Sequence, residues 1–222
     1  MGKVLEMTRM RSVFLIGLLA TALSACSSDT IQSGSGKGLF GKSEPAAVSP
    51  RTAALVQQGA PAYVAVLEAH EGAQTVFLRQ TVNAKAEETW ISNEELSLGM
   101  KRGMVLATRG FGGDVLAIDA SQTAAALRAG RLSNVNRFMT FLDGNSQART
   151  LAFKCQIERG ETYPIDFGTF KIQTVYFSEA CRNADMSFIN KYWVDVKDRR
   201  IIESSQWMGN TIGALGLRII PR

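Results

Sequence analysis

The chain has 222 residues and a formal net charge of +5 at pH 7, from 25 Lys and Arg against 20 Asp and Glu. This length suits one domain with additional segments and is enough for a sizeable hydrophobic core without a structural metal. The weak basic excess shows no large cluster, so the chain lacks the Lys- and Arg-rich face of a nucleic-acid-binding protein and no nucleic-acid partner is expected. One histidine, His70, and three well-separated cysteines predict no metal site and no cofactor.

The first 25 residues have the three parts of a secretory signal peptide. Basic residues precede an uncharged apolar run, Val13 to Leu23, and small residues come after it. The run is too short for a transmembrane helix, which needs about 20 apolar residues. We therefore expect residues 1–25 to be removed as a signal peptide, with Met7 and Met10 as alternative start sites.

The segment Leu23-Ser24-Ala25-Cys26 resembles the lipobox of bacterial lipoproteins. In that class the thiol receives a diacylglyceryl group, the chain is cut before the cysteine and the new amino group is acylated. The resemblance implies lipidation of Cys26 by acyl chains such as palmitate, each buried CH₂ adding about 0.8 kcal/mol of membrane affinity. Serines rather than an Asp come directly after the cysteine, which implies an anchor in the outer membrane, on its periplasmic face. The alternative is an ordinary signal peptide that happens to contain a cysteine.

Residues 26–50, from the lipidated cysteine onward, are rich in Ser, Gly and Pro and have no apolar period, which predicts a flexible tether. Gly36 to Ser43 matches the spelling of a phosphate-binding P-loop. That motif needs a strand before it and a helix after it, and Glu44-Pro45 stands in the place of the helix. We therefore interpret this segment as linker.

From residue 51 to 222 the chain predicts a single β-rich domain. Arg51 to Gln58 is short enough for only one or two helical turns, and Ala120 to Arg131 is the one clear helix, with Ser121 as its cap and Gly130 at its end. The remaining elements are short strands, because apolar and polar residues alternate between turn signals. The strands expected in the first half are residues 62–69, 74–81, 87–92, 104–108 and 114–119, with Gly110 to Gly113 as a hairpin turn between the last two.

The second half alternates more strongly. The expected strands are residues 136–142, 149–158, 168–180, 191–196, 201–206 and 215–220. Around ten short strands with no fixed repeat predict an all-β fold, an antiparallel sandwich or a partly open barrel with one short helix.

Cys155 and Cys181 remain after lipidation. An exported chain enters an oxidising compartment, so this even pair predicts a disulfide, which would stabilise the fold by roughly 3 kcal/mol in the chain-entropy model. Two free buried thiols are the alternative.

Catalytic patterns are weak, so no enzyme and no catalytic residue is predicted. The nucleophile motif G-x-S-x-G is absent, and a glycosidase would need two facing carboxylates, which the sequence cannot place among Asp195, Glu203, Asp166 and Glu161. Aromatic rings that could stack on sugars are the better candidates for contact with a glycan or a partner: Trp90, Trp193 and Trp207. Core packing is the alternative for each of them.

The C-terminal strands carry a family resemblance. Tyr192-Trp193-Val194-Asp195, then Ser205-Gln206 and Met208-Gly209, together with the lipobox and the segment around Trp90, resemble the YjbF/GfcB family of outer-membrane lipoproteins. The resemblance covers about residues 51 to 222, through several short motifs of which none is diagnostic alone.

The resemblance implies an all-β accessory factor for exopolysaccharide or group 4 capsule production, with no established catalytic centre. It also implies a partnership with an outer-membrane β-barrel polysaccharide-export protein and with a periplasmic capsule-biosynthesis protein. The expected role is docking on that barrel or holding polysaccharide there. The alternatives are a periplasmic glycan-modifying hydrolase or lyase and a structural envelope protein.

Overall fold

The computed structural model describes residues 49–67 and 73–221. The chain divides into two compact units, Met1–Gly34 and Ser35–Arg222, and every described residue belongs to the second. The predicted signal peptide, Cys26, nearly all of the predicted tether and His70 lie outside the described residues. Among the residues that are described, no helix has the length and apolar character needed to cross a bilayer.

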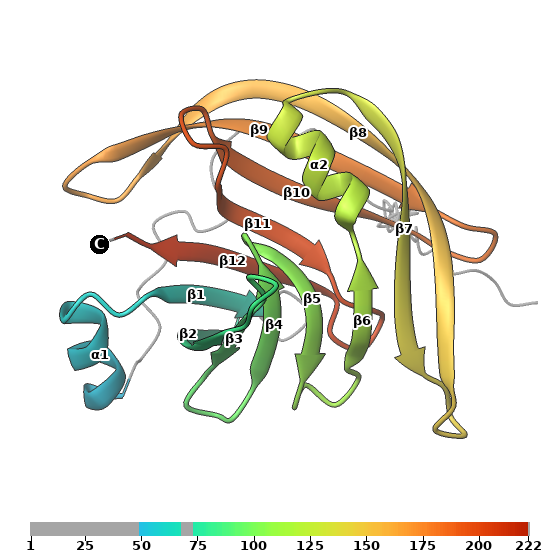
Figure 1. The fold of residues 1–222 in the computed structure, drawn as a ribbon, viewed down its shortest axis with the longest axis horizontal. Coiled ribbons are helices and arrows are strands. Elements are labelled where there is room, and N and C mark those ends of the chain that lie inside the picture. Colours follow the sequence, from blue (N-terminus) through green and yellow to red (C-terminus); the bar gives the residue numbers. More distant parts are fainter. Residues whose placement is uncertain (1–48, 68–72, 222) are drawn as a thin grey trace, which may run out of the picture. The chain divides into compact units, whose positions relative to one another are not determined.

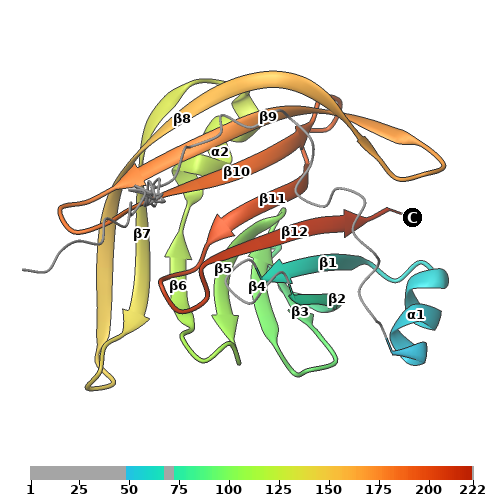
Figure 2. The ribbon, with the colours of Figure 1, turned by 180° about the vertical axis from the view of Figure 1, so that it is seen from behind.

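The described unit is all-β, as the sequence predicted. Twelve antiparallel strands form one sheet that curls into a nearly closed barrel (Figures 1 and 2), in the order β5-β4-β3-β2-β1-β12-β11-β10-β9-β8-β7-β6. The strands are β1 (Ala62–Leu67), β2 (Ala73–Val82), β3 (Glu88–Ile91), β4 (Ser97–Lys101), β5 (Met104–Arg109), β6 (Val115–Asp119), β7 (Ser133–Leu142), β8 (Ala148–Asp166), β9 (Lys171–Arg182), β10 (Ser187–Asp195), β11 (Ile201–Trp207) and β12 (Ala214–Ile220).

Most strands pair with their neighbours in sequence, which is why local alternation predicted them. β1 pairs with β2, with Ala65 opposite Thr75, and β8 pairs with β9, with Cys155 opposite Cys181. One long-range pairing, between β1 and β12 with Tyr63 opposite Ile219, joins the first half of the sheet to the second. β4 was not predicted, because Ser97–Lys101 is short and contains Gly99 in place of a β-branched run.

The predicted hairpin around Gly110 to Gly113 is wrong. β5 and β6 are the two edge strands of the sheet, so the segment between them crosses the seam where the barrel nearly closes. Side-chain hydrogen bonds, and not a ladder of backbone hydrogen bonds, connect the two strands at this seam. The Thr108 hydroxyl donates to Asp114 at 2.9 Å and accepts from the Val115 N–H at 2.9 Å. Asp114 also accepts from the Gly110 N–H at 2.9 Å, so its carboxylate organises the turn.

A buried glutamine in β11 completes the edge strand β5. Oε1 of Gln206 accepts from the Val105 N–H at 3.1 Å, and its Nε2 donates to the Gly103 carbonyl at 2.9 Å. Gln206 is fully buried, so these bonds satisfy backbone groups that water does not reach. One amide side chain therefore ties β11 to the edge of the sheet.

Two helices accompany the sheet in the described part of the chain. α1 (Pro50–Gln57) begins at Ser49, whose hydroxyl oxygen accepts from the Thr52 N–H at 3.2 Å. α2 (Ser121–Ala129) ends at Gly130 in the left-handed conformation, as predicted. The predicted cap at Ser121 is wrong, because Ala120 holds the cap position and Asp119 accepts from the Ser121 N–H instead. α2 lies beneath the arch of β8 to β10 (Figures 1 and 2).

The core lies on both faces of the sheet. The main cluster fills the barrel interior and includes Leu127 of α2, Met104, Phe177 and Tyr192. A smaller cluster of Ile165, Trp193 and Ile202 lies on the outer face, where the end of the long β8–β9 hairpin contributes Phe167 and Ile172. This second cluster buries strand residues that alternation alone would place in solvent.

Candidate binding site at the mouth of the barrel

A cavity of about 800 Å³ forms a mouth at one end of the barrel. Its walls come from β1 to β3, the β4–β5 turn, α2, the turn before β11 and the end of β12. Segments far apart in the sequence therefore surround one hollow. A cavity of this size is in the range of small-molecule and oligosaccharide sites.

The floor of the mouth is aromatic. The rings of Tyr63 and Trp90 meet edge to face with their centroids 4.7 Å apart. Both side chains are buried, and burial raises the pKa of the Tyr63 hydroxyl well above its usual range, with the Glu88 carboxylate adding to the shift. The phenol therefore stays neutral at physiological pH, available as a hydrogen-bonding group.

A carboxylate fixes the wall beside this floor. Glu88 accepts from the Trp90 indole N–H at 3.2 Å and from the Arg79 guanidinium at 3.2 Å. The Arg79 guanidinium carbon lies 5.9 Å from the Trp90 ring centroid, which is a cation–π arrangement. Glu88 thus holds both side chains in place, and its own charge is offset by Arg79.

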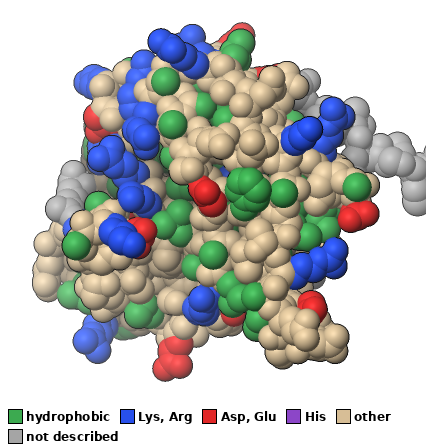
Figure 3. All heavy atoms as spheres, turned by 45° about the vertical axis from the view of Figure 1, so that its right-hand side comes forward, with side chains coloured by type: hydrophobic (Ala, Val, Ile, Leu, Met, Phe, Trp, Pro, Cys, Tyr) green, Lys and Arg blue, Asp and Glu red, His purple; other side chains and the backbone are tan. Residues whose placement is uncertain are grey.

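The rim is basic. Within the described residues, four cations that line the mouth have no ion pair: Lys101, Arg102, Arg128 and Arg199. The other two, Arg79 and Arg200, pair with Glu88 at 3.2 Å and with Asp198 at 2.5 Å. Figure 3 shows one face of the molecule, on which Lys and Arg side chains gather along the left-hand side of the view with few acidic neighbours. Because the acidic groups of the mouth are already paired, the rim keeps a positive excess.

Backbone geometry places these cations. Arg102 and Gly103 form the β4–β5 turn with φ of 53° and 85°, and a Cβ on Gly103 would lie 2.9 Å from the Cβ of Ile201. Arg128 lies in the last turn of α2. A Cβ on Gly130 would lie 3.4 Å from Nη1 of Arg199, so this guanidinium lies against the negative end of the same helix.

A buried polar cluster lies in the barrel interior. Oε2 of Glu179 accepts from Arg137 at 3.1 Å, from Asn190 at 2.7 Å and from the Tyr192 hydroxyl at 2.9 Å. Thr123 of α2 donates to the other carboxylate oxygen. Burial and the Glu179 charge raise the pKa of Tyr192 well above its usual range. This cluster connects α2 to β7, β9 and β10, so its role in the described structure is to join the helix to the sheet.

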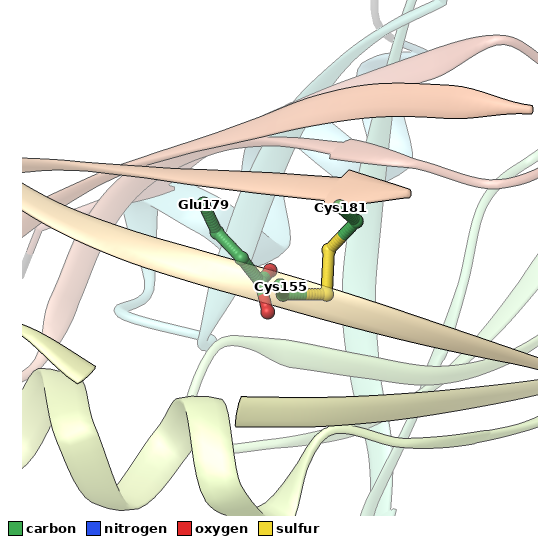
Figure 4. A group of neighbouring side chains, drawn as sticks. All are labelled: Cys155, Glu179 and Cys181. Carbon is green, nitrogen blue, oxygen red and sulfur yellow. A yellow bond between two sulfur atoms is a disulfide. The ribbon is translucent and has the colours of Figure 1, made fainter. Parts of the chain in front are cut away.

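The predicted disulfide between Cys155 and Cys181 is present, joining directly opposite residues of β8 and β9. Figure 4 shows the Glu179 carboxylate beside it, and the possible ligand atoms of the three residues lie within 4.8 Å of one another. The two sulfurs are bonded to each other and neither is a thiolate. In this state the trio is therefore a buried carboxylate next to a disulfide.

The three tryptophans predicted for contact have different surroundings. Trp90 lines the mouth but is only 3% exposed. Trp193 is buried on the outer face, 5.2 Å from the Tyr176 ring, because the β8–β9 hairpin covers it. Trp207 is partly buried and stacks on Phe188 at 4.3 Å. Trp193 therefore presents no exposed ring for stacking on a sugar. The alternation along β10 gave no sign of this, because the residues that cover Trp193 belong to other strands.

The four carboxylates considered for catalysis each have a structural contact. Glu203 pairs with Arg218 at 2.6 Å, and Asp166 pairs with Lys171 at 3.2 Å. Asp195 accepts from the Lys197 N–H at 2.7 Å, and Glu161 accepts from the Tyr163 hydroxyl at 3.3 Å. None of the four lines the mouth.

Sequence reasoning missed the basic rim. Two short basic pairs, Lys101-Arg102 and Arg199-Arg200, lie far apart in the sequence, and the structure brings both to the same cavity. The available signal was that each pair comes shortly before a predicted strand, residues 104–108 and 201–206. Only the closure of the sheet, which no local pattern encodes, brings those pairs together.

Comparisons with known proteins give a family and a fold. Residues 42–220 match the model of a family described as group 4 capsule polysaccharide lipoprotein GfcB, YjbF. The crystal structure of the hypothetical lipoprotein YmcC from Escherichia coli (K12) is similar in fold, with a TM-score of 0.64 and 14% sequence identity. That likeness covers 73% of this chain and 87% of that one. Among curated protein sequences, none matches this chain.

Proposed function

The chain belongs to the YjbF family of group 4 capsule polysaccharide lipoproteins, and from that premise we propose that it is a non-catalytic accessory factor that holds the polysaccharide during assembly or export. Lipidation at Cys26 anchors it to the periplasmic face of the outer membrane. The domain then holds a segment of polymer in the mouth of its barrel, beside an outer-membrane β-barrel export protein.

The observation that carries this proposal is the mouth itself. An aromatic floor formed by Tyr63 and Trp90 lies below a basic rim, in a cavity of about 800 Å³. Sugar rings present C–H faces that pack on aromatic surfaces and hydroxyls that need polar partners. Phe170, which lines the mouth and is 43% exposed, offers the aromatic surface, and the rim side chains offer the polar partners. The family description supplies the polymer class.

Holding fits the mouth better than cleavage. Glycoside hydrolysis uses one carboxyl group as acid and a second as nucleophile or base. Among the residues that the structure describes, two acidic side chains line the mouth: Glu88, which is engaged by Arg79 and Trp90, and Asp198, which is engaged by Arg200. Both carboxylates thus serve as anchors for neighbouring side chains.

The tether supports a position beside an export barrel. Residues 26–50 would reach about 80 Å from the membrane when fully extended, and less as a coil. Such a linker keeps the domain at the membrane while its mouth tracks a moving polymer. Surface apolar side chains give less support to docking as the main role, since those most exposed are spread over several strands and loops: Val82, Ile91, Leu132, Phe138, Leu142, Phe170 and Ile189.

Two forms of the protein test the proposal in cells that lack the native copy. One is the wild-type lipoprotein, and the other carries Cys26→Ser behind a signal peptide that an ordinary signal peptidase removes. We expect wild type to fractionate with the outer membrane, to co-purify with polymer and export barrel, and to restore surface polysaccharide. The secreted form should bind polymer in solution and restore little.

A separate assay tests the absence of catalysis. Purified polymer incubated with the protein should keep its chain length on size-exclusion chromatography. Shortened chains would replace the proposed holding role with the glycan-modifying alternative. Recovery of no polymer with the lipoprotein would count against holding.

A further inference from the structure

We infer that the mouth is an anion-selective site that takes acidic sugar residues, those bearing carboxylate groups, in an extended polymer chain. This inference rests on the proposed function, because it names the chemical class of the glycan that the mouth holds. It is carried by the charge of the rim, by the arrangement of its cations around two adjoining hollows and by the aromatic floor.

The charge balance of the rim comes first. Lys101, Arg102, Arg128 and Arg199 face the mouth without an ion pair in the described part of the chain, while Glu88 and Asp198 are neutralised by Arg79 and Arg200. Cations that converge on one hollow repel each other, and an anion between them removes that repulsion. A concave surface of one sign also raises the local concentration of ligands of the opposite sign.

The position of the cations indicates an extended ligand. A second hollow of about 620 Å³ adjoins the mouth and is lined by the start of β5, the end of β6 and the start of α2. Two carboxylates, Glu87 and Asp119, also line this second hollow, against three cations. Lys101, Arg102 and Arg128 line both hollows. They therefore form a ridge between two spaces, where a chain lying across the ridge would place one sugar in each hollow and its acidic groups on the cations.

The chemistry of the cations suits carboxylates. Three of the four are arginines, whose planar guanidinium groups bind carboxylates through two parallel hydrogen bonds. The negative end of α2 explains why Arg128 and Arg199 lie where they do, but Lys101 and Arg102 belong to a β-turn and have no such partner. The rim thus has more positive charge than its own fold uses.

Hydrophobic contacts complete the site. Phe170, in the turn of the β8–β9 hairpin, also lines the mouth and is 43% exposed. Its exposed ring offers a surface for the apolar face of a sugar ring at the edge of the mouth. An anionic membrane surface is the competing partner for a basic patch, but a flat bilayer cannot enter the two hollows on either side of the ridge. The acidic glycan is therefore the occupant that uses the whole site.

The test measures binding of defined oligosaccharides by calorimetry. The protein is the full mature chain in its secreted form, with Cys26→Ser. The probes are hexagalacturonate, which carries a carboxylate on each sugar, and maltohexaose, which is neutral. We expect hexagalacturonate to bind about tenfold or more tightly than maltohexaose, and to weaken several-fold when salt rises from about 20 to about 200 mM.

A matched pair of variants locates the binding. Lys101→Gln with Arg128→Gln removes two positive charges from the ridge, and Arg149→Gln with Lys191→Gln removes two from exposed strand positions outside both hollows. We expect the ridge variant to bind hexagalacturonate at least about tenfold more weakly, because it loses two charge-assisted contacts. The control variant should bind within about twofold of wild type, since its charges are remote and screened.

The outcomes separate this inference from the proposed function. Equal binding of both oligosaccharides, or equal losses in the two variants, would overturn the anion-selective ridge. If the protein also still binds its own purified polymer, the holding role stands. Failure to bind that polymer would overturn both. Sedimentation with phosphatidylglycerol vesicles, without any hexagalacturonate binding, would assign the ridge to the membrane and refute the inference.

Discussion

The buried ion pair between Arg137 and Glu179 allows a sharp test of how the barrel interior is held. Both side chains are 0% exposed, and their closest atoms are 3.1 Å apart. Nε and Nη2 of Arg137 have no hydrogen-bond partner in the described structure. The positive charge of Arg137 is therefore stabilised mainly by the Glu179 carboxylate. We predict that Glu179→Gln, which keeps the shape of the side chain and removes its charge, strongly destabilises the protein.

The expected magnitude comes from the burial. Removing one partner of a buried ion pair leaves an uncompensated charge and costs about 3–5 kcal/mol. Arg137→Met should cost less, because Glu179 would keep its hydrogen bonds from Thr123, Asn190 and Tyr192. The double variant Arg137→Met with Glu179→Gln buries no charge, so we expect it to lie within about 2 kcal/mol of wild type.

Urea denaturation at neutral pH measures these differences. The secreted full-length form should show a lower midpoint for Glu179→Gln at an unchanged slope, which indicates a loss of stability and not a change of the exposed surface. The exposed pair of Asp166 and Lys171, with side chains 57% and 60% exposed, is the control. Asp166→Asn there should cost less than about 1 kcal/mol.

The double-variant cycle decides whether the reasoning holds. If the two substitutions simply add, or if the double variant is less stable than Glu179→Gln alone, then charge compensation does not explain the stability of the cluster. A Glu179→Gln variant that matches the exposed control would refute the argument as well, because it would mean that water reaches the pair.

Further predictions concern the disulfide, a turn glycine and acid stability. Reduction of the disulfide should lower the free energy of unfolding by about 3 kcal/mol, measured by urea titration with and without dithiothreitol; no change would exclude the chain-entropy account. Gly103→Ala should lower the free energy of unfolding by about 1–3 kcal/mol, because the φ of Gly103 is 85° and the new Cβ would lie 2.9 Å from the Cβ of Ile201. Gly144→Ala is the control: a Cβ there has no atom within 4 Å, so its melting temperature should stay close to that of wild type. The hydrogen bond from Thr75 lowers the pKa of Glu94 below its usual 4.5. The ionised carboxylate therefore stabilises the fold above pH 4.5, and this stabilisation is lost as the pH falls through the pKa of Glu94 in the folded protein. Glu94→Gln should therefore reduce the loss of stability in an acid titration below about pH 4.5, and an unchanged titration would rule out this role.

Elements whose partners are close in sequence were predictable. The β7–β8 and β10–β11 hairpins, the last strand and the end of α2 at Gly130 were all visible as alternation bounded by turn residues. The disulfide was also predictable from the cysteine count and the predicted signal peptide, since an oxidising compartment favours pairing of the two remaining cysteines. In each of these cases the relevant signal lies in the residue types of the chain and their local order.

Elements that depend on closure of the sheet were not predictable. Gly110 to Gly113 had the composition of a hairpin turn, but the flanking strands are opposite edges of the sheet. The alternation along β10 predicts that either Tyr192 or Trp193 faces solvent, but the β8–β9 hairpin covers Trp193. Burial of a strand face is decided by the segment that lies on top of it, and that cover comes from residues distant in sequence.

By itself, the sequence determined the strand-rich class of the domain, several of its hairpins, its disulfide and its family, because alternation, turn residues and motif spacing are local properties of the chain. Only the tertiary structure decided that twelve strands nearly close on themselves and that two separate basic turns and the end of α2 surround one aromatic-floored mouth. The physical reason is that a cavity forms only when distant segments pack together. Its charge and shape therefore depend on residues that lie far apart in the sequence, which no local pattern connects.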